Sequence, residues 1–124
     1  MTEKRILAAD RVRRLPREGW SWVDRRFLRE YASRLSGDAL LLYFFLAAVS
    51  DKHGLSFYSD SAIALRLRMT EPMVAAGRDE LIQWDLVAYQ APLSQVLSLP
   101  PVARGGNGRL SSLGEVLRRL GESS

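Results

Sequence analysis

The sequence predicts a mainly α-helical domain that ends in a small β-hairpin, and three observations support this fold class. The 12-residue run Ala39–Ser50 is apolar almost throughout, which is typical of a helix that is buried on all sides. Two segments of helical character follow, and each is preceded by a hydroxyl side chain suited to an N-cap, Ser59 or Thr70. Two short β-prone runs then flank the turn Ala91–Ser94.

The N-terminal part is expected to contain a basic arm with a short helix in it, followed by one further helix. Residues 1–19 are rich in arginine and contain a proline and a glycine, so we predict an arm with a short helix over Glu3–Val12. A second helix should begin after an N-cap at Asp24 and end near Leu35, because apolar residues recur three and four positions apart. Asp38 is then expected to cap the apolar helix.

Beyond the apolar helix the pattern predicts a strand, two helices and a hairpin. Leu55–Tyr58 should form a short strand after the turn at His53 and Gly54. A helix over Asp60–Leu67 and a turn over Arg68–Thr70 follow, and the next helix should run to about Trp84. The core-facing residues expected of the first of these helices are Ile63, Leu65 and Leu67. The predicted strands of the hairpin are Leu86–Gln90 and Gln95–Leu99.

We therefore divide the chain into four parts. Residues 1–19 form the basic arm and residues 20–99 the folded domain. Residues 100–109 begin with two prolines and continue into a glycine-rich stretch, which predicts a flexible linker. Residues 110–124 are expected to hold a short amphipathic helix, Ser112–Leu120, with a tail. Trp20 and Trp22 should either clamp the arm to the core or form a surface for a partner, and Trp84 should cover the base of the hairpin.

Composition argues against several classes of function. The chain has no cysteine and one histidine, His53, so we predict no thiolate or multi-histidine metal site and no cofactor. With one histidine in a turn and no phosphate-binding loop, we expect no catalytic site and no enzyme. No apolar run approaches the roughly 20 residues that cross a membrane, and the N-terminus lacks the features of a signal peptide. We expect a cytoplasmic, bacterial protein.

The segment TEPMVAAGRDELIQWDLVAY, which starts at Thr70, carries a family resemblance. It resembles the recognition helix and first wing strand of bacterial winged helix-turn-helix proteins, particularly replication initiators, replisome organisers and regulators of plasmids and mobile elements. The resemblance covers about 40 residues. It implies a winged helix-turn-helix with extra N-terminal helices, and binding to double-stranded DNA. The matching residues are Val74, Gly77, Arg78, Glu80, Leu81, Ile82, Leu86 and Val87.

The resemblance and the residue chemistry together predict a set of DNA contacts. The second helix of a helix-turn-helix enters the major groove with its N-terminal residues foremost, which selects Thr70, Met73 and Arg78 as reading residues. Arg78 is the strongest candidate because arginine pairs with guanine through two hydrogen bonds. Arg66 and Arg68 are expected to bind phosphates, and Gln90 and Gln95 of the wing should touch the backbone. The arm would contribute Arg11, Arg13, Arg14 and Arg17, beside Lys4 and Arg5.

The distribution of charge keeps a second interpretation open. Residues 1–35 carry ten basic and five acidic side chains, whereas residues 36–99 carry four basic and seven acidic ones. Basic groups supply most of the sequence-independent affinity of a DNA-binding protein, so this affinity should come mainly from the arm. Ala75 and Ala76 occupy positions where relatives often have polar or basic residues, and Glu71 and Asp79 are acidic. The alternative is a protein-interaction adaptor or dimerisation module that uses residues 110–124 to contact a second copy or another protein.

Overall fold

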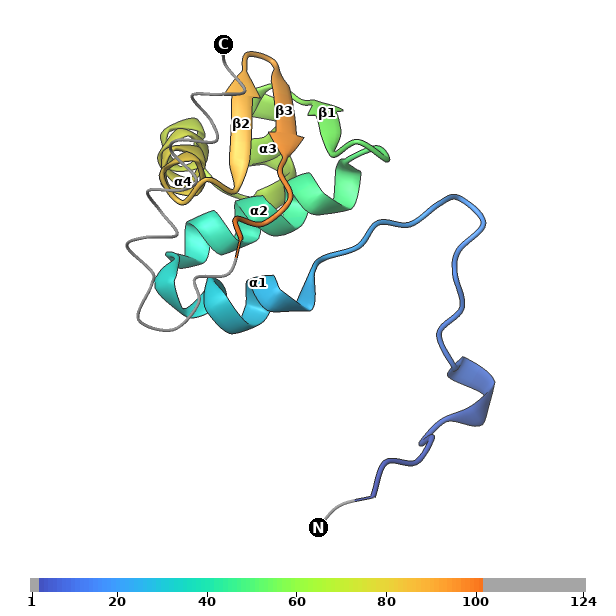
Figure 1. Ribbon diagram of the computed structural model, residues 1–124. Coiled ribbons are helices and arrows are strands. Elements are labelled where there is room, and N and C mark those ends of the chain that lie inside the picture. Colours follow the sequence, from blue (N-terminus) through green and yellow to red (C-terminus); the bar gives the residue numbers. More distant parts are fainter. Residues whose placement is uncertain (1–2, 102–124) are drawn as a thin grey trace, which may run out of the picture.

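The computed structural model describes residues 3–101 of the chain (Figure 1). From α1 onward, the helices and strands follow one another in the order that the sequence predicts. The elements are α1 (Arg25–Glu30), α2 (Gly37–Val49), β1 (Leu55–Phe57), α3 (Asp60–Leu67), α4 (Glu71–Gln83), β2 (Val87–Gln90) and β3 (Leu93–Val96), with short 3₁₀ turns at Ala9–Arg11 and Ala32–Arg34. The predicted linker from residue 102 and the predicted helix Ser112–Leu120 lie outside the described residues.

The three strands form one antiparallel sheet in the order β1–β3–β2. β1 pairs with β3 through Leu55 and Gln95, and β2 pairs with β3 through Val87 and Val96. A helix, a strand, two helices and a hairpin in this order give the protein a winged-helix-like topology, with the β2–β3 hairpin in the place of the wing. The predicted fold class, mainly α with a small hairpin, is confirmed.

The hairpin is tighter than the sequence predicts. The turn consists of Ala91 and Pro92, joined by a cis peptide bond, and β3 already begins at Leu93. Leu93 and Ser94, expected in the turn, therefore pair with Gln90 and Tyr89 of β2. The strand ends at Val96 rather than Leu99. Proline and serine favour a turn in the sequence, but Ser94 forms part of the strand because it pairs with Tyr89 of β2.

Side-chain caps fix most helix starts where the sequence places them. The hydroxyl oxygens of Ser59 and Thr70 accept hydrogen bonds from the amides of Ala62 and Met73, and Asp24 caps α1 in the same way. These three caps are confirmed. Asp38 is not the cap of α2, because Ser36 accepts from the amide of Ala39, so the helix starts before Asp38. Asp38 instead lies in the first turn, where its charge suits the helix dipole.

Two other helix predictions are wrong in extent. The arm holds only the 3₁₀ turn Ala9–Arg11 rather than a helix over Glu3–Val12, and none of the described arm residues through Trp20 is buried. Without an apolar surface to pack on, a segment this short lacks the tertiary contacts that stabilise helices in proteins. The helix expected over residues 24–35 ends at Glu30 and continues as a 3₁₀ turn. Leu65 is 82% exposed and does not face the core.

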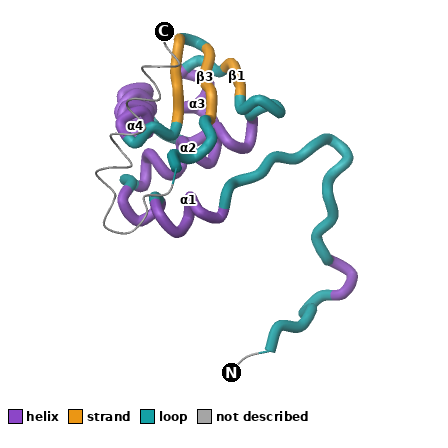
Figure 2. The backbone as a smooth tube through the Cα atoms, viewed as in Figure 1, coloured by secondary structure: helices purple, strands orange, loops and turns teal. Residues whose placement is uncertain are grey.

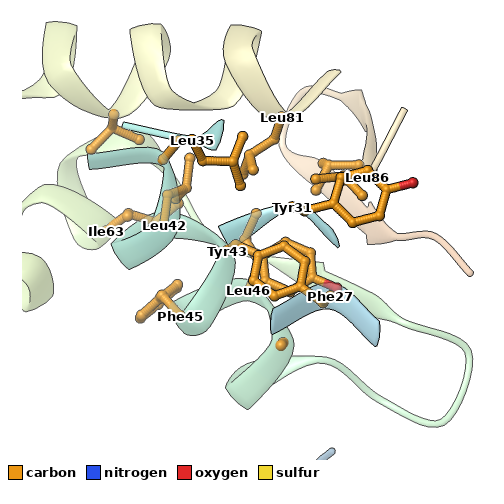
Figure 3. Close-up of a cluster of buried hydrophobic side chains, with 14 of the residues drawn as sticks. Phe27, Tyr31, Leu35, Leu42, Tyr43, Phe45, Leu46, Ile63, Leu81 and Leu86 are labelled. Atoms are coloured by element: carbon orange, nitrogen blue, oxygen red, sulfur yellow. The ribbon is translucent and has the colours of Figure 1, made fainter. Parts of the chain in front are cut away.

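The core lies around α2, as the apolar run predicts (Figure 3). Leu42 and Leu46 of α2 are fully buried together with Ile63 of α3 and Leu81 of α4. The ring of Tyr43 stacks on Phe27 of α1 with 3.9 Å between the ring centroids, which fastens α1 to the domain. The helix is nevertheless not buried all round, since Phe44 is 63% exposed. No helix in residues 3–101 is long and apolar enough to cross a membrane.

Candidate nucleic-acid interface

The turn between α3 and α4 is held by backbone and cap hydrogen bonds. Arg68 ends α3 in the left-handed conformation, at φ 59° and ψ 44°. The amide of Met69 donates to the carbonyl oxygen of Ala64 at 3.0 Å, which closes the end of the helix. Thr70 then starts α4 by accepting from the amide of Met73 at 3.2 Å. The two helices are thus joined by a turn of three residues with a defined geometry.

Arg66 and Arg68 are both exposed and lie at the end of α3, directly before the start of α4. Neither guanidinium forms an ion pair with another of the described residues. Thr70 and Met73, at the first turn of α4, are exposed as well. Four of the residues predicted to touch DNA are therefore solvent-accessible and close to one another along this turn. Two uncompensated positive charges at this point suit a phosphate oxygen.

Arg78 does not lie with them. It is only 6% exposed, and both of its terminal nitrogens donate to the carboxylate of Asp60, at 3.3 Å for the Nη1–Oδ2 pair. Its guanidinium also lies over the ring of Tyr89, 3.9 Å from the ring centroid. An arginine whose donors are used inside the protein does not present its fork to a guanine. In the structure, the side chain of Arg78 links α3, α4 and β2.

The partners of Arg78 were not found from the sequence. Asp60 is 18 positions away and looks like an ordinary acidic residue in the first turn of a helix, where it is favourable for a different reason. Tyr89 looks like a strand residue of the wing. The signal in the sequence is weak: one arginine within an otherwise acidic and apolar helix, one acidic residue at the start of α3 and one aromatic residue near the end of β2. The contact between Arg78 and Asp60 depends on how α3 packs against α4, and the distance between the two residues in the sequence does not predict this packing.

The exposed face of α4 is acidic and apolar. Glu71 and Asp79 are exposed, and no basic side chain of the helix joins them because Arg78 is buried. Ala76 is exposed as well, and Met73 and Ile82 are 37% and 42% exposed. Glu80 is turned to the domain, where its carboxylate accepts from the amide of Ser36 at 2.7 Å. This face repels phosphates and offers few donors to base edges, so a direct reading of bases through α4 would rely on Thr70 and Met73.

The two wing residues predicted to touch DNA are on the outer face of the sheet. Gln95 of β3 is exposed and alternates with Ser94, which is buried at 2% exposure. Gln90 ends β2 and is exposed beside the turn of the hairpin. Neither strand of the hairpin carries a lysine or an arginine. The wing thus provides amide groups for a backbone contact but no positive charge.

The arm is exposed along its described length and extends away from the domain (Figure 2). Its hydrogen bonds are local, from Arg11 to Ala8 and from Gly19 to Pro16. The first contact with the domain is the hydroxyl of Ser21, which donates to the carbonyl oxygen of Ala47. The arm leaves the domain beside α1, away from the hairpin turn (Figure 1). Four predicted DNA contacts, Arg11, Arg13, Arg14 and Arg17, are therefore exposed but not gathered at the α3–α4 turn.

The aromatic residues and the histidine are placed as follows. Trp20 and Trp22 are 59% and 70% exposed, so neither is a core anchor. Trp84 packs edge-on against Tyr31 of the segment after α1 and lies under Arg34. His53 lies in the predicted turn, where its amide donates to Asp51. Backbone amides of Leu55 and His53 lower the pKa of the Asp51 carboxyl below its usual range.

Comparisons with known proteins do not assign a family. Scans against protein-family models, curated proteins and solved structures found no match to this chain. No group of three or more histidine or acidic side chains among residues 3–101 is arranged to hold a metal ion. The fold itself is winged-helix-like, and its most distinctive surface is the α3–α4 turn with its two exposed arginines.

Proposed function

We propose that this protein binds double-stranded DNA through its winged-helix-like domain and its basic arm. We further propose that it acts in transcriptional control, or in replication or transposition, of a bacterial mobile element or plasmid. This second, finer part rests on the resemblance of the segment from Thr70 to Tyr89 to regulators and initiators of such elements. The binding proposal rests on the charges and exposure of described residues.

One observation carries the proposal: Arg66 and Arg68 are exposed at the turn before α4 and have no ion-pair partner within residues 3–101. In a helix-turn-helix, this turn lies close to the DNA backbone when the second helix enters the major groove. Two arginines placed there would neutralise phosphates and release counterions. The arm would add sequence-independent affinity, and Gln90 and Gln95 would contact the backbone from the wing.

The exposed face of α4 is acidic and apolar, so few of its side chains are able to contact bases. Thr70 and Met73 are the residues that would meet base edges, through a hydroxyl and an apolar contact. Arg78 holds α4 against α3 and β2, so it sets the orientation of the helix and does not touch DNA. Because few groups are available to read bases, binding should be strongly salt-dependent and only modestly selective between sequences.

A salt titration of duplex binding tests the proposal. The double variant Arg66→Ala/Arg68→Ala is compared with the wild-type chain by fluorescence anisotropy, at salt concentrations of about 50 to 200 mM. Each phosphate contact that is lost lowers the slope of log K against log salt by about one, so the double variant should lower the slope by about two. Its affinity should fall for all duplex sequences alike.

The matched control is the double variant Arg25→Ala/Arg29→Ala. These two arginines are also exposed and lie four positions apart on α1. Their replacement removes the same amount of positive charge. The control should keep the wild-type slope. An equal loss in both variants would mean that net charge alone governs binding, and the assignment to the α3–α4 turn would be wrong.

A second candidate function is favoured by the acidic and apolar face of α4. A winged helix with this face fits an adaptor that docks another protein without reading bases, and basic or apolar groups of a partner would complement Glu71, Asp79 and Ile82. The same titration separates the two functions. Absence of duplex binding at about 50 mM salt and micromolar protein would rule out the first and leave the second.

A further inference from the structure

The outward face of α2 is apolar from one end to the other. Leu41, Phe44 and Ala48 are spaced three and four positions apart and form one exposed stripe along the helix. Leu41 is 40% exposed and Phe44 is 63% exposed. A helix on the surface of a domain ordinarily shows polar residues on the side away from the core. This stripe has none between Leu41 and Ala48, so α2 has a second apolar face besides the one in the core.

The chain before α1 widens this face. Trp22 and Val23 are 70% and 46% exposed, and they line a shallow depression together with Phe44 and Ala48. The hydroxyl of Ser21 donates to the carbonyl oxygen of Ala47, which holds this segment against α2. We call Trp22, Val23, Leu41, Phe44 and Ala48 the outer patch of α2. Contiguous exposed apolar residues of this kind mark a surface that another element covers.

The chain leaves the described structure close to α1. Arg26 of α1 donates a hydrogen bond to the carbonyl oxygen of Pro100, one residue before the described part ends at Pro101. Residues 102–111 are ten residues, which reach at most about 33 Å when extended. The 13 residues of α2 span only about 20 Å at 1.5 Å per residue. Leu99 lines a depression together with Trp22 of the outer patch, so the described chain ends close to the patch and ten residues are enough for the following segment to reach it.

The sequence of that segment matches the outer patch in period and in length. Leu113, Val116, Leu117 and Leu120 recur at the spacing of one helix face, with Glu115, Arg118 and Arg119 at the other positions. Leu113 and Leu120 are seven positions apart, as are Leu41 and Ala48, so each stripe is about 10 Å long. Two apolar stripes of equal length on helices pack well against each other.

We propose that residues 112–120 form an amphipathic helix that packs on the outer patch of α2 of the same chain. A short linker favours this arrangement over a second copy, because it gives the segment a local concentration in the millimolar range. The packed segment would cover Phe44 and Trp22 and would complete the domain as a further helical layer. This proposal does not depend on whether the protein binds DNA.

Hydrogen exchange followed by mass spectrometry on the full chain tests the proposal. Amides in residues 112–120 should exchange at least about tenfold more slowly than expected for an unstructured peptide. The variant Phe44→Ser removes the centre of the outer patch, and protection of residues 112–120 should then fall by about tenfold. Phe44 is mostly exposed, so the domain itself should keep its wild-type exchange.

The matched control is Leu65→Ser, which removes an 82% exposed side chain of α3 outside the outer patch. It should leave the protection of residues 112–120 unchanged. Absence of protection in the wild-type chain, or equal protection in Phe44→Ser, would overturn the proposal. Protection that is lost on dilution, together with a dimeric mass by light scattering, would also overturn it by assigning the outer patch to a second copy.

Discussion

Two observations about Arg78 lead to different roles: its position in the sequence and its contacts in the structure. Its position in a helix that resembles a recognition helix suggests contact with DNA, while its neighbours in the folded protein occupy both terminal nitrogens and one face of the guanidinium. The carboxylate of Asp60 accepts from both terminal nitrogens, and the ring of Tyr89 lies against the guanidinium plane. A planar cation with several donors suits such a site better than lysine does. At the residue scale, the side chain expected to read bases is a connector of α3, α4 and β2.

Removal of this connector should lower stability. Arg78→Ala leaves the Asp60 carboxylate without its partner and opens a space beside Tyr89. We expect the free energy of unfolding to fall by about 2–3 kcal/mol, which is less than for a fully buried pair because the Asp60 side chain is 28% exposed. Urea denaturation of Arg78→Ala, Asp60→Ala and the double variant measures the coupling. Effects that simply add would contradict a direct interaction between the two residues.

At the element scale, two glycines show how closely neighbouring elements approach. Gly77 of α4 faces the start of α2, where a Cβ would lie 3.5 Å from the Cα atom of Ala39, an ordinary contact distance. Gly54, between α2 and β1, has φ of 84°, and a Cβ there would collide with the carbonyl oxygen of Val96. The same region is closed by the amide of Val96, which donates to the carbonyl oxygen of Gly54 at 2.8 Å. The backbone at Gly77 therefore has room for a methyl side chain, whereas the backbone at Gly54 does not.

The substitution of alanine for each glycine should have opposite effects. Gly54→Ala introduces both a strained backbone and a backbone collision, so the free energy of unfolding should fall by about 2 kcal/mol or more. Gly77→Ala finds space and favours the helix, so stability should stay equal or rise by up to about 1 kcal/mol. Thermal denaturation followed by circular dichroism measures both. A destabilised Gly77→Ala would show that α2 and α4 pack too closely for a methyl group.

At the scale of the whole molecule, the arm has a net positive charge and the folded domain does not: residues 1–19 carry six basic and three acidic side chains, whereas residues 20–99 carry eight basic and nine acidic ones. The arm carries Lys4, Arg5 and four further arginines, its described residues are all exposed, and Ser21 after it donates a hydrogen bond to Ala47 of α2. The segment from residue 36 to residue 99 has more acidic than basic residues. Affinity for a polyanion and stability of the fold should thus depend on different parts of the chain.

Replacement of the four arm arginines with glutamine checks this separation. The variant Arg11→Gln/Arg13→Gln/Arg14→Gln/Arg17→Gln should keep the wild-type melting temperature, because these side chains make no contact with the core. Its affinity for duplex DNA should fall, and the salt slope should decrease by up to about four if every arginine neutralises a phosphate. A melting temperature lowered by several degrees would show that the arm packs on the domain. An unchanged slope would remove the arm from the proposed interface.

The sequence by itself determined the elements whose signals are local. Hydroxyl caps at Ser59 and Thr70 act through hydrogen bonds within three residues, so α3 and α4 start where they were predicted. The apolar run of α2 predicted a central helix because a helix made almost wholly of apolar side chains loses free energy only when most of them leave water. Its outward stripe was not predicted, because an all-apolar helix gives no indication of which side remains exposed.

Only the tertiary structure decided which side chains meet. Asp60, Arg78 and Tyr89 come from three elements, and their contact follows from how α3, α4 and the hairpin pack. The exposure of Arg66, Arg68 and Phe44 depends on the same packing. Local hydrogen bonds and periodicity act over a few residues and can be read along the chain, whereas burial, pairing and exposure are set by neighbours distant in sequence. For this protein the fold class could therefore be predicted from the sequence, whereas the side chains that are exposed at the candidate interface could not.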